Sequence, residues 1–150
     1  MAIRNLTNFY DEKFRKISKE VVKFDERLWM LLDDMRDTLI HVNGYGCAAV
    51  YVGILRRVVV VVDKDNTIEL INPEIIEASS ETQEVLEGSI APNAPREYVA
   101  RPKSVAISAL DRNGKPIIIN GEGFLAATFC HEIDHLDGIL FTDKASKTRE

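Results

Sequence analysis

The chain has 150 residues, 45% of them hydrophobic, and a single domain of this length buries roughly 70% of the surface that its unfolded chain exposes. The formal net charge of −5 argues against a nucleic-acid partner, because binders of that class carry overall positive charge. The sequence has no signal-peptide core, no apolar run of membrane-spanning length and only two cysteines. We therefore expect one cytoplasmic domain over residues 1–150, with free thiols and no membrane partner.

Two helices are predicted in the N-terminal third. A short helix near residues 11–18 would place Phe14 and Ile17 on one face. A longer helix over residues 25–41 starts at Asp25, a good N-cap, and ends before an Asn-Gly pair. Its i, i+3, i+4, i+7 pattern predicts one buried stripe, made of Leu28, Leu31, Leu32, Met35 and Leu39.

The middle of the chain is typical of strands, which we expect at residues 57–62, 67–71, 74–79, 105–110 and 115–120. Residues 57–62 are continuous and β-branched, which indicates burial on both faces. The pair at 72–73, Asn-Pro, should separate two strands. The turn signal Asp-Arg-Asn-Gly at 111–114 predicts a hairpin between the last two.

A last helix is predicted from about residue 124 to Gly138, followed by a polar tail over 139–150 that we expect to fray. It carries the sequence H-E-x-x-H. Four residues advance about 400° around a helix, so His131 and His135 lie on one face, about 6 Å apart along the axis. Both imidazoles can then reach one metal ion, and Glu132 is placed to act as general base on a water whose pKa the metal lowers toward about 7.

Such a metal site needs a third protein ligand. Fifteen residues follow His135, and their sole glutamate is Glu150, so a zinc-protease arrangement with a downstream Glu ligand is disfavoured. The third ligand has to come from upstream or be absent. The alternative is a helix whose two histidines are ordinary buried or surface groups.

Over essentially the whole chain the sequence resembles the peptide deformylases. Residues 130–138, CHEIDHLDG, are similar to the family's QHExDHLxG. Residues 44–53, GYGCAAVYVG, resemble GxGLAAPQVG, and residues 87–94, EGSIAPNA, resemble EGCLSVPG. The pair at 101–102 matches an Arg-Pro of the family.

The resemblance implies an α+β fold in which antiparallel β-sheets pack around a central C-terminal helix that carries HEIDH. It implies metal-dependent hydrolysis of the formyl group of N-formylmethionyl peptides, with nascent peptides and the ribosome as partners. The implied cofactor is a divalent metal, Fe²⁺ in the family, with Zn²⁺ or Ni²⁺ as alternatives.

The resemblance also implies roles for individual residues. His131, His135 and Ser89 stand at the positions of the metal ligands, and Glu132 at that of the proton shuttle. The oxyanion positions are the side chain of Tyr51 and the backbone N–H of Ile90; the substrate-binding positions are Gly44, Gly46 and Arg101.

Two of these positions depart from the family motif, and three functions therefore stay open. Ser89 replaces the ligand Cys, which should weaken metal binding, and Tyr51 replaces the oxyanion Gln, a loss that typically costs about 10² to 10³ in rate. The chain is then a deformylase with weak or lost activity, a non-catalytic paralogue that binds peptide, metal or ribosome, or a metal amidohydrolase with another N-acyl substrate. Cys47, in the first motif, is an alternative third ligand.

Overall fold

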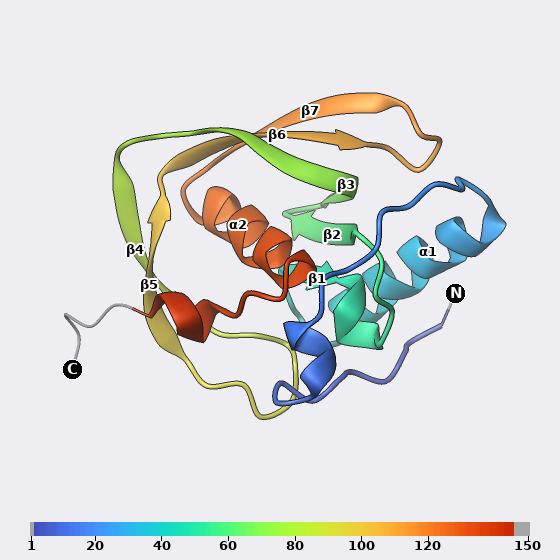
Figure 1. Cartoon of the computed structure of the whole chain (residues 1–150), viewed down its shortest axis with the longest axis horizontal. Coiled ribbons are helices and arrows are strands. Elements are labelled where there is room, and N and C mark those ends of the chain that lie inside the picture. The colour runs from blue at the N-terminus through green and yellow to red at the C-terminus, as the bar shows by residue number, and fades with distance from the viewer. Residues whose placement is uncertain (1, 146–150) are drawn as a thin grey trace.

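The fold contains two antiparallel sheets, and the computed structural model describes residues 2–145 (Figure 1). The larger sheet has the order β1 (Gly46–Ala48), β2 (Val58–Asp63), β3 (Asn66–Ala78), β6 (Ser104–Leu110) and β7 (Pro116–Glu122). The smaller pairs β4 (Thr82–Glu87) with β5 (Glu97–Pro102). Every neighbouring pair of strands is antiparallel.

Helix α2 (Phe124–Leu136) lies in the middle of the molecule (Figure 1). It contacts β1, β2, β3 and β7 of the larger sheet and β5 of the smaller one. This arrangement confirms the predicted α+β class. The other helix is α1 (Glu26–His41), and short 3₁₀ turns occur as η1 (Glu12–Arg15), η2 (Ala49–Val52) and η3 (Phe141–Lys144).

Helix α1 forms as its sequence pattern predicts. The Asp25 side chain accepts a hydrogen bond from the Leu28 N–H at 3.2 Å, which satisfies one of the free donors at the helix start. All five members of the apolar stripe are buried, and the helix packs this face onto β1 and β2. Asn43 follows the end of the helix with a left-handed φ of 55°. Among residues 2–145, no helix is both long and apolar enough to cross a membrane.

The predicted break in the third strand is wrong. Strand β3 runs without interruption through Asn72, which adopts a left-handed φ of 52° at a bulge. The Asn72 side chain bonds both backbone groups of Val21, at 2.9 Å each, and this fixes the bulge. The strand pairs with β2 before the bulge and mainly with β6 after it, so one long strand joins the two halves of the sheet.

Two predictions at the chain ends are also corrected. Near residues 11–18 the chain forms only η1; Phe14 is buried there, but Ile17 is 71% exposed, so the two do not share a face. The tail is expected to fray from residue 139, but Phe141 is only 1% exposed. Its ring stacks on that of His131 with 5.2 Å between the ring centroids, so this part of the tail packs against the core beside α2. Residues 146–150 of the predicted fraying tail lie outside the described residues.

Candidate active site and metal centre

Helix α2 presents His131, Glu132 and His135 to one spot in the interior. The three side chains are buried, and their candidate ligand atoms all lie within 4.8 Å of one another. The Nε2 atoms of the two histidines are 3.2 Å apart. The helical spacing in the sequence therefore produces the convergence that it predicts.

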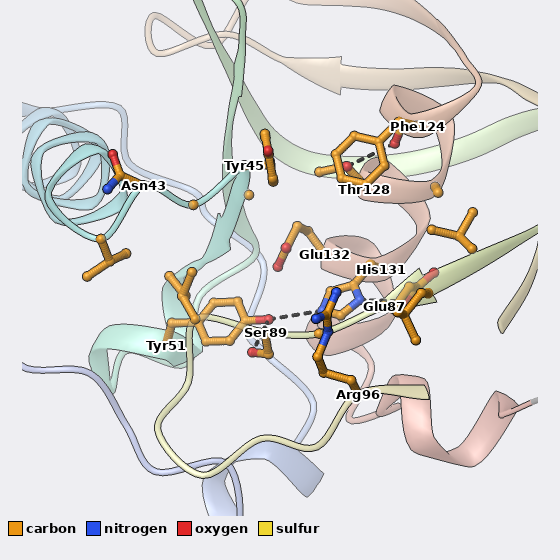
Figure 2. A pocket seen from close by; sticks show the side chains of 18 residues that line it. Asn43, Tyr45, Tyr51, Glu87, Ser89, Arg96, Phe124, Thr128, His131 and Glu132 are labelled. Atoms are coloured by element: carbon orange, nitrogen blue, oxygen red, sulfur yellow. Dashed lines mark hydrogen bonds and ion pairs between the residues drawn. The ribbon is translucent and has the colours of Figure 1, made fainter. Parts of the chain in front are cut away.

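Tyr51 and Ser89 face these histidines from two other segments. Tyr51 lies on η2, and its Oη is 3.1 Å from His131 Nε2 (Figure 2). Ser89, just after β4, donates to Tyr51 Oη at 3.2 Å and accepts from the Ala91 N–H at 3.1 Å. Burial raises the pKa of Tyr51 well above its usual range, so its phenol is neutral and donates to His131. The tyrosine oxygen thus lies between the serine and the histidine.

A buried ion-pair network holds His131 from the other side. The Glu87 carboxylate accepts from His131 Nδ1 at 2.7 Å and from Arg101 at 2.6 and 2.8 Å, and Arg101 also binds Asp134 at 2.8 Å. Burial opposes a charge on Glu87, but hydrogen bonds from Arg101 and His131 lower its pKa below the usual value. Because Glu87 is ionised it can only accept, so His131 carries its proton on Nδ1 and turns the Nε2 lone pair toward Tyr51.

Sequence reasoning missed the two acidic members of this network. Glu87 opens the second family-like segment, and Asp134 follows His131 by three residues on α2, but neither pattern by itself indicates a role. Arg101, predicted to bind substrate, is 2% exposed and directs its guanidinium to these two carboxylates. Its contacts in the structure are those of a residue that positions Glu87.

A cavity of about 510 Å³ opens over the site, and backbone of the first family-like segment lines it. Gly44, Gly46 and Ile90 all line this cavity, as do the site side chains on α2 except His135, which lies behind them. A Cβ at position 46 would lie 2.7 Å from Glu132 Oε2 and 2.9 Å from Thr128 Cγ2. The glycine therefore allows the strand backbone to approach the carboxylate closely.

Two buried polar atoms of the site have no hydrogen-bond partner among residues 2–145, Glu132 Oε1 and His135 Nδ1. Burial raises the pKa of Glu132 to about 7 and lowers that of His135 well below its usual range. The Nε2 atoms of His135 and His131 are 3.2 Å apart, so one neutral ring can donate its N–H to the other. A cation that binds both nitrogens would take the place of this proton.

The site fits a metal ion by a simple geometric test. Two nitrogens bound to a tetrahedral ion at about 2.0–2.1 Å are roughly 3.3 Å apart. The observed separation of 3.2 Å between His131 Nε2 and His135 Nε2 agrees with that value. The bond from Glu87 to His131 Nδ1 is the outer contact that metal-binding histidines commonly make.

Comparison with known proteins identifies the family. A model of the family described as polypeptide deformylase matches residues 3–150. A protein named peptide deformylase from Acetivibrio thermocellus is 49% identical over 144 residues, which are 96% of this chain and 84% of that protein. One from Caldicellulosiruptor bescii is 50% identical over 145 residues, 96% of this chain and 86% of its own. The chain belongs to the peptide deformylase family.

Solved peptide deformylases have the same fold. The enzyme from Legionella pneumophila aligns with a TM-score of 0.91 at 41% identity, over 98% of this chain and 88% of its own. The peptide deformylase from Thermotoga maritima aligns with a TM-score of 0.93 at 34% identity, over 97% of this chain and 99% of its own. The similarity confirms the fold that the sequence motifs imply.

The two cysteines of this member of the peptide deformylase family lie outside the cluster of candidate metal ligands that residues 2–145 form. Cys47 and Cys130 are both buried free thiols. The Cys47 thiol donates to the Ala48 carbonyl at 3.5 Å, and burial raises its pKa well above the usual value. Neither belongs to the cluster of possible metal ligands, which is His131, Glu132 and His135. The groups that face His131 from outside α2 and the Glu87 network include two hydroxyl oxygens, those of Tyr51 and Ser89.

Proposed function

We propose that this chain hydrolyses the formyl group of N-formylmethionyl peptides with the help of a divalent metal, at a rate far below that of a deformylase with the family's Cys and Gln. The observation that carries this proposal is the pair of buried imidazole nitrogens 3.2 Å apart beside Glu132. Nascent chains leaving the ribosome in the cytoplasm are the proposed source of substrate.

His131 and His135 would hold the metal, and an oxygen from the Tyr51–Ser89 pair would fill the third protein position. The proposed ion is Fe²⁺, with Zn²⁺ or Ni²⁺ as alternatives. A bound metal of this kind supplies Lewis acidity and lowers the pKa of water to about 7. Glu87 keeps the His131 ring oriented, and Arg101 keeps Glu87 in place.

Glu132 is the proposed proton carrier. Its carboxylate lines the cavity, and its Oε1 has no partner among residues 2–145, so it is available to a water or to a leaving amine. A carboxylate in this position takes a proton from the attacking water and gives it to the amino nitrogen of the peptide's N-terminal methionine as the bond from that nitrogen to the formyl carbon breaks and formate leaves. The absence of a side chain at Gly46 leaves room for this carboxylate beside β1.

The proposed substrate path follows the cavity. The backbone at Gly44 and Gly46 would pair with an extended peptide, since both positions line the cavity and carry no side chain. The Ile90 N–H would stabilise the developing oxyanion. Tyr51 stands where the family has a second oxyanion donor, but its hydroxyl is bonded to His131 and Ser89. The loss of one such donor costs about 10² to 10³ in rate.

The test is hydrolysis of a formyl-Met tripeptide by metal-free protein to which Fe²⁺, Ni²⁺, Zn²⁺ or Co²⁺ is added separately. We expect slow, metal-dependent turnover that disappears in Glu132→Ala, a variant that keeps both histidines. Turnover equal to that of Glu132→Ala with all four metals would refute the proposal and leave a non-catalytic, peptide-binding paralogue. Hydrolysis of N-acetyl but not N-formyl substrates would instead indicate an amidohydrolase of different specificity.

A further inference from the structure

Four side-chain atoms of the site form an unbroken series with nearly equal spacing. His135 Nε2 is 3.2 Å from His131 Nε2, which is 3.1 Å from Tyr51 Oη, which is 3.2 Å from Ser89 Oγ. Ligands of one tetrahedral ion at about 2.0–2.1 Å are roughly 3.3 Å apart. The tyrosine oxygen therefore lies at the distance from His131 Nε2 that another ligand of the same ion would have.

We propose that the phenolic oxygen of Tyr51 is the third protein ligand of the metal, and that Ser89 supports this oxygen instead of binding the ion. This inference rests on the metal site of the proposed function and names its missing ligand. The inference changes the expected role of both residues. Tyr51 becomes a metal ligand instead of an oxyanion donor, and Ser89 becomes a hydrogen-bond donor to that ligand instead of a ligand itself.

The hydrogen bonds favour Tyr51 over Ser89 as the ligand. Tyr51 Oη lies directly beside His131 Nε2, whereas Ser89 Oγ is one hydrogen bond further along the series. Ser89 already accepts from the Ala91 N–H and donates to Tyr51, and this donation stabilises negative charge on the phenolic oxygen. A donor held in this way suits the role of an outer partner.

The chemistry of the two side chains points the same way. A phenol is a stronger acid than an aliphatic alcohol, so a bound cation replaces its proton more readily; burial opposes a negative charge on Tyr51 until a cation is present and raises its pKa. Phenolate is an anionic donor, as is the thiolate that the family motif supplies. Tyr51 thus restores the charge balance of two neutral imidazoles and one anion, which a neutral serine hydroxyl does not.

Packing leaves the tyrosine ring in place. Tyr51 is 1% exposed, and its ring meets those of Phe14 and His135 edge-on at centroid distances of 5.4 and 5.0 Å. Turn η2, which carries Tyr51, is followed by Gly53, whose left-handed φ is 82°. The oxygen is therefore presented to the histidines by a fixed side chain and not by a mobile one.

The test is a Zn²⁺ titration of chelator-treated protein, followed by near-ultraviolet difference absorbance and by competition with a chromophoric chelator. Zn²⁺ has no absorbance of its own, so a new near-ultraviolet band reports conversion of phenol to phenolate. We expect the band to saturate at one Zn²⁺ per chain. Tyr51→Phe should abolish it and weaken Zn²⁺ binding by more than about 100-fold, beyond the loss that an outer partner causes.

Ser89→Ala provides the discriminating comparison. It should keep the band and weaken Zn²⁺ binding by about 10–100-fold, as expected for an outer partner. Tyr10→Phe is the matched control, since Tyr10 is 71% exposed and far from the histidines in sequence; it should change neither readout. Circular dichroism confirms that each variant is folded before the titration.

The outcomes separate this inference from the function on which it rests. Zn²⁺ binding without a phenolate band, abolished by Ser89→Ala, would make Ser89 the ligand and overturn the inference, while the proposed metal-dependent function would stand. No Zn²⁺ binding by the wild-type protein would overturn both. The band together with retained binding in Ser89→Ala supports Tyr51 as the ligand whatever the rate of deformylation.

Discussion

The site has two walls that differ in how far they depart from the family motif. The helix wall consists of His131, Glu132 and His135 on α2, and it matches the motif residue for residue. The oxygen wall consists of Tyr51 on η2 and Ser89 after β4, where the motif has Gln and Cys. The comparison teaches that the frame for a metal and a proton carrier can stay intact while the groups opposite it are exchanged.

The helix wall is the more strongly constrained of the two. Glu87, Arg101 and Asp134 join β4, β5 and α2 through charges with almost no exposure to solvent. Removing one partner of such a pair leaves charge buried without compensation, which costs far more than a surface contact. On the oxygen wall, Ser89 makes two hydrogen bonds between neutral groups, one to the Tyr51 hydroxyl and one from the Ala91 N–H. Substitution of Ser89 should therefore disrupt the fold less than the loss of one partner of a buried ion pair.

The largest effect should come from Glu87→Ala, which breaks the buried network. Loss of one member of a buried ion pair typically destabilises a protein by about 3–5 kcal/mol, and the freed His131 ring should weaken metal binding by about 10–100-fold. Urea unfolding and Zn²⁺ competition measure the two effects. Glu97→Ala is the matched control, because Glu97 lies directly opposite Glu87 in the β4–β5 register but is exposed.

A destabilisation of Glu87→Ala no larger than that of Glu97→Ala would mean that Asp134 alone satisfies the Arg101 guanidinium. In that case the buried network would not explain why the helix wall keeps the residues of the family motif. The proposed difference in constraint between the two walls would then be wrong.

The second effect tests the oxygen wall. The double variant Tyr51→Gln, Ser89→Cys restores the amide donor and the thiol of the family motif against an unchanged helix wall. We expect deformylation to rise by about 10²–10³-fold, the value of one oxyanion donor, provided that the metal is supplied. The measurement is kcat/KM on a formyl-Met peptide with Ni²⁺ or Zn²⁺. Adding Glu132→Ala to the double variant should abolish this increase in kcat/KM. If the double variant has the same kcat/KM as the wild-type protein, then Tyr51 and Ser89 do not limit the rate of deformylation.

The sequence predicts the helices well because local rules decide them. The Asp25 cap and the apolar stripe of α1 depend on neighbours three or four residues away, as does the convergence of His131 and His135. The break expected at Asn72 is wrong because a partner remote in the chain, Val21, stabilises the bulge and keeps β3 continuous. Local pattern carries no information about that contact.

The unpredicted part of the site is likewise non-local. Arg101 contacts Glu87, 14 residues away in the sequence, and Asp134, 33 residues away. Tyr51 and His131, which are also in contact, are 80 residues apart in the sequence. The motif resemblance gives the identities at these positions but not their contacts. Hence the placement of the Tyr51 hydroxyl between Ser89 and His131 could be found only in the structure.

The smallest effect should come from Gly46→Ala, which tests how the two walls meet. The added Cβ would lie 2.7 Å from Glu132 Oε2, 2.9 Å from Glu132 Cγ and 2.9 Å from Thr128 Cγ2, so these side chains, or the helix that carries them, have to move away from β1. Overpacking of this kind costs about 1–3 kcal/mol, and displacement of the carboxylate should lower kcat more than it raises KM. Thermal unfolding and steady-state kinetics measure the two consequences.

Gly88→Ala is the matched control for this change. Gly88 also lines the cavity, but a Cβ there would lie 3.6 Å from Arg96 Cγ, an ordinary contact distance, and the backbone does not need a left-handed φ. Its stability should change little or rise slightly, because alanine restricts the unfolded chain. If Gly46→Ala is as neutral as Gly88→Ala, then β1 and α2 yield to each other. The position of Glu132 would then depend on the metal and its ligands and not on the packing of the strand against the helix.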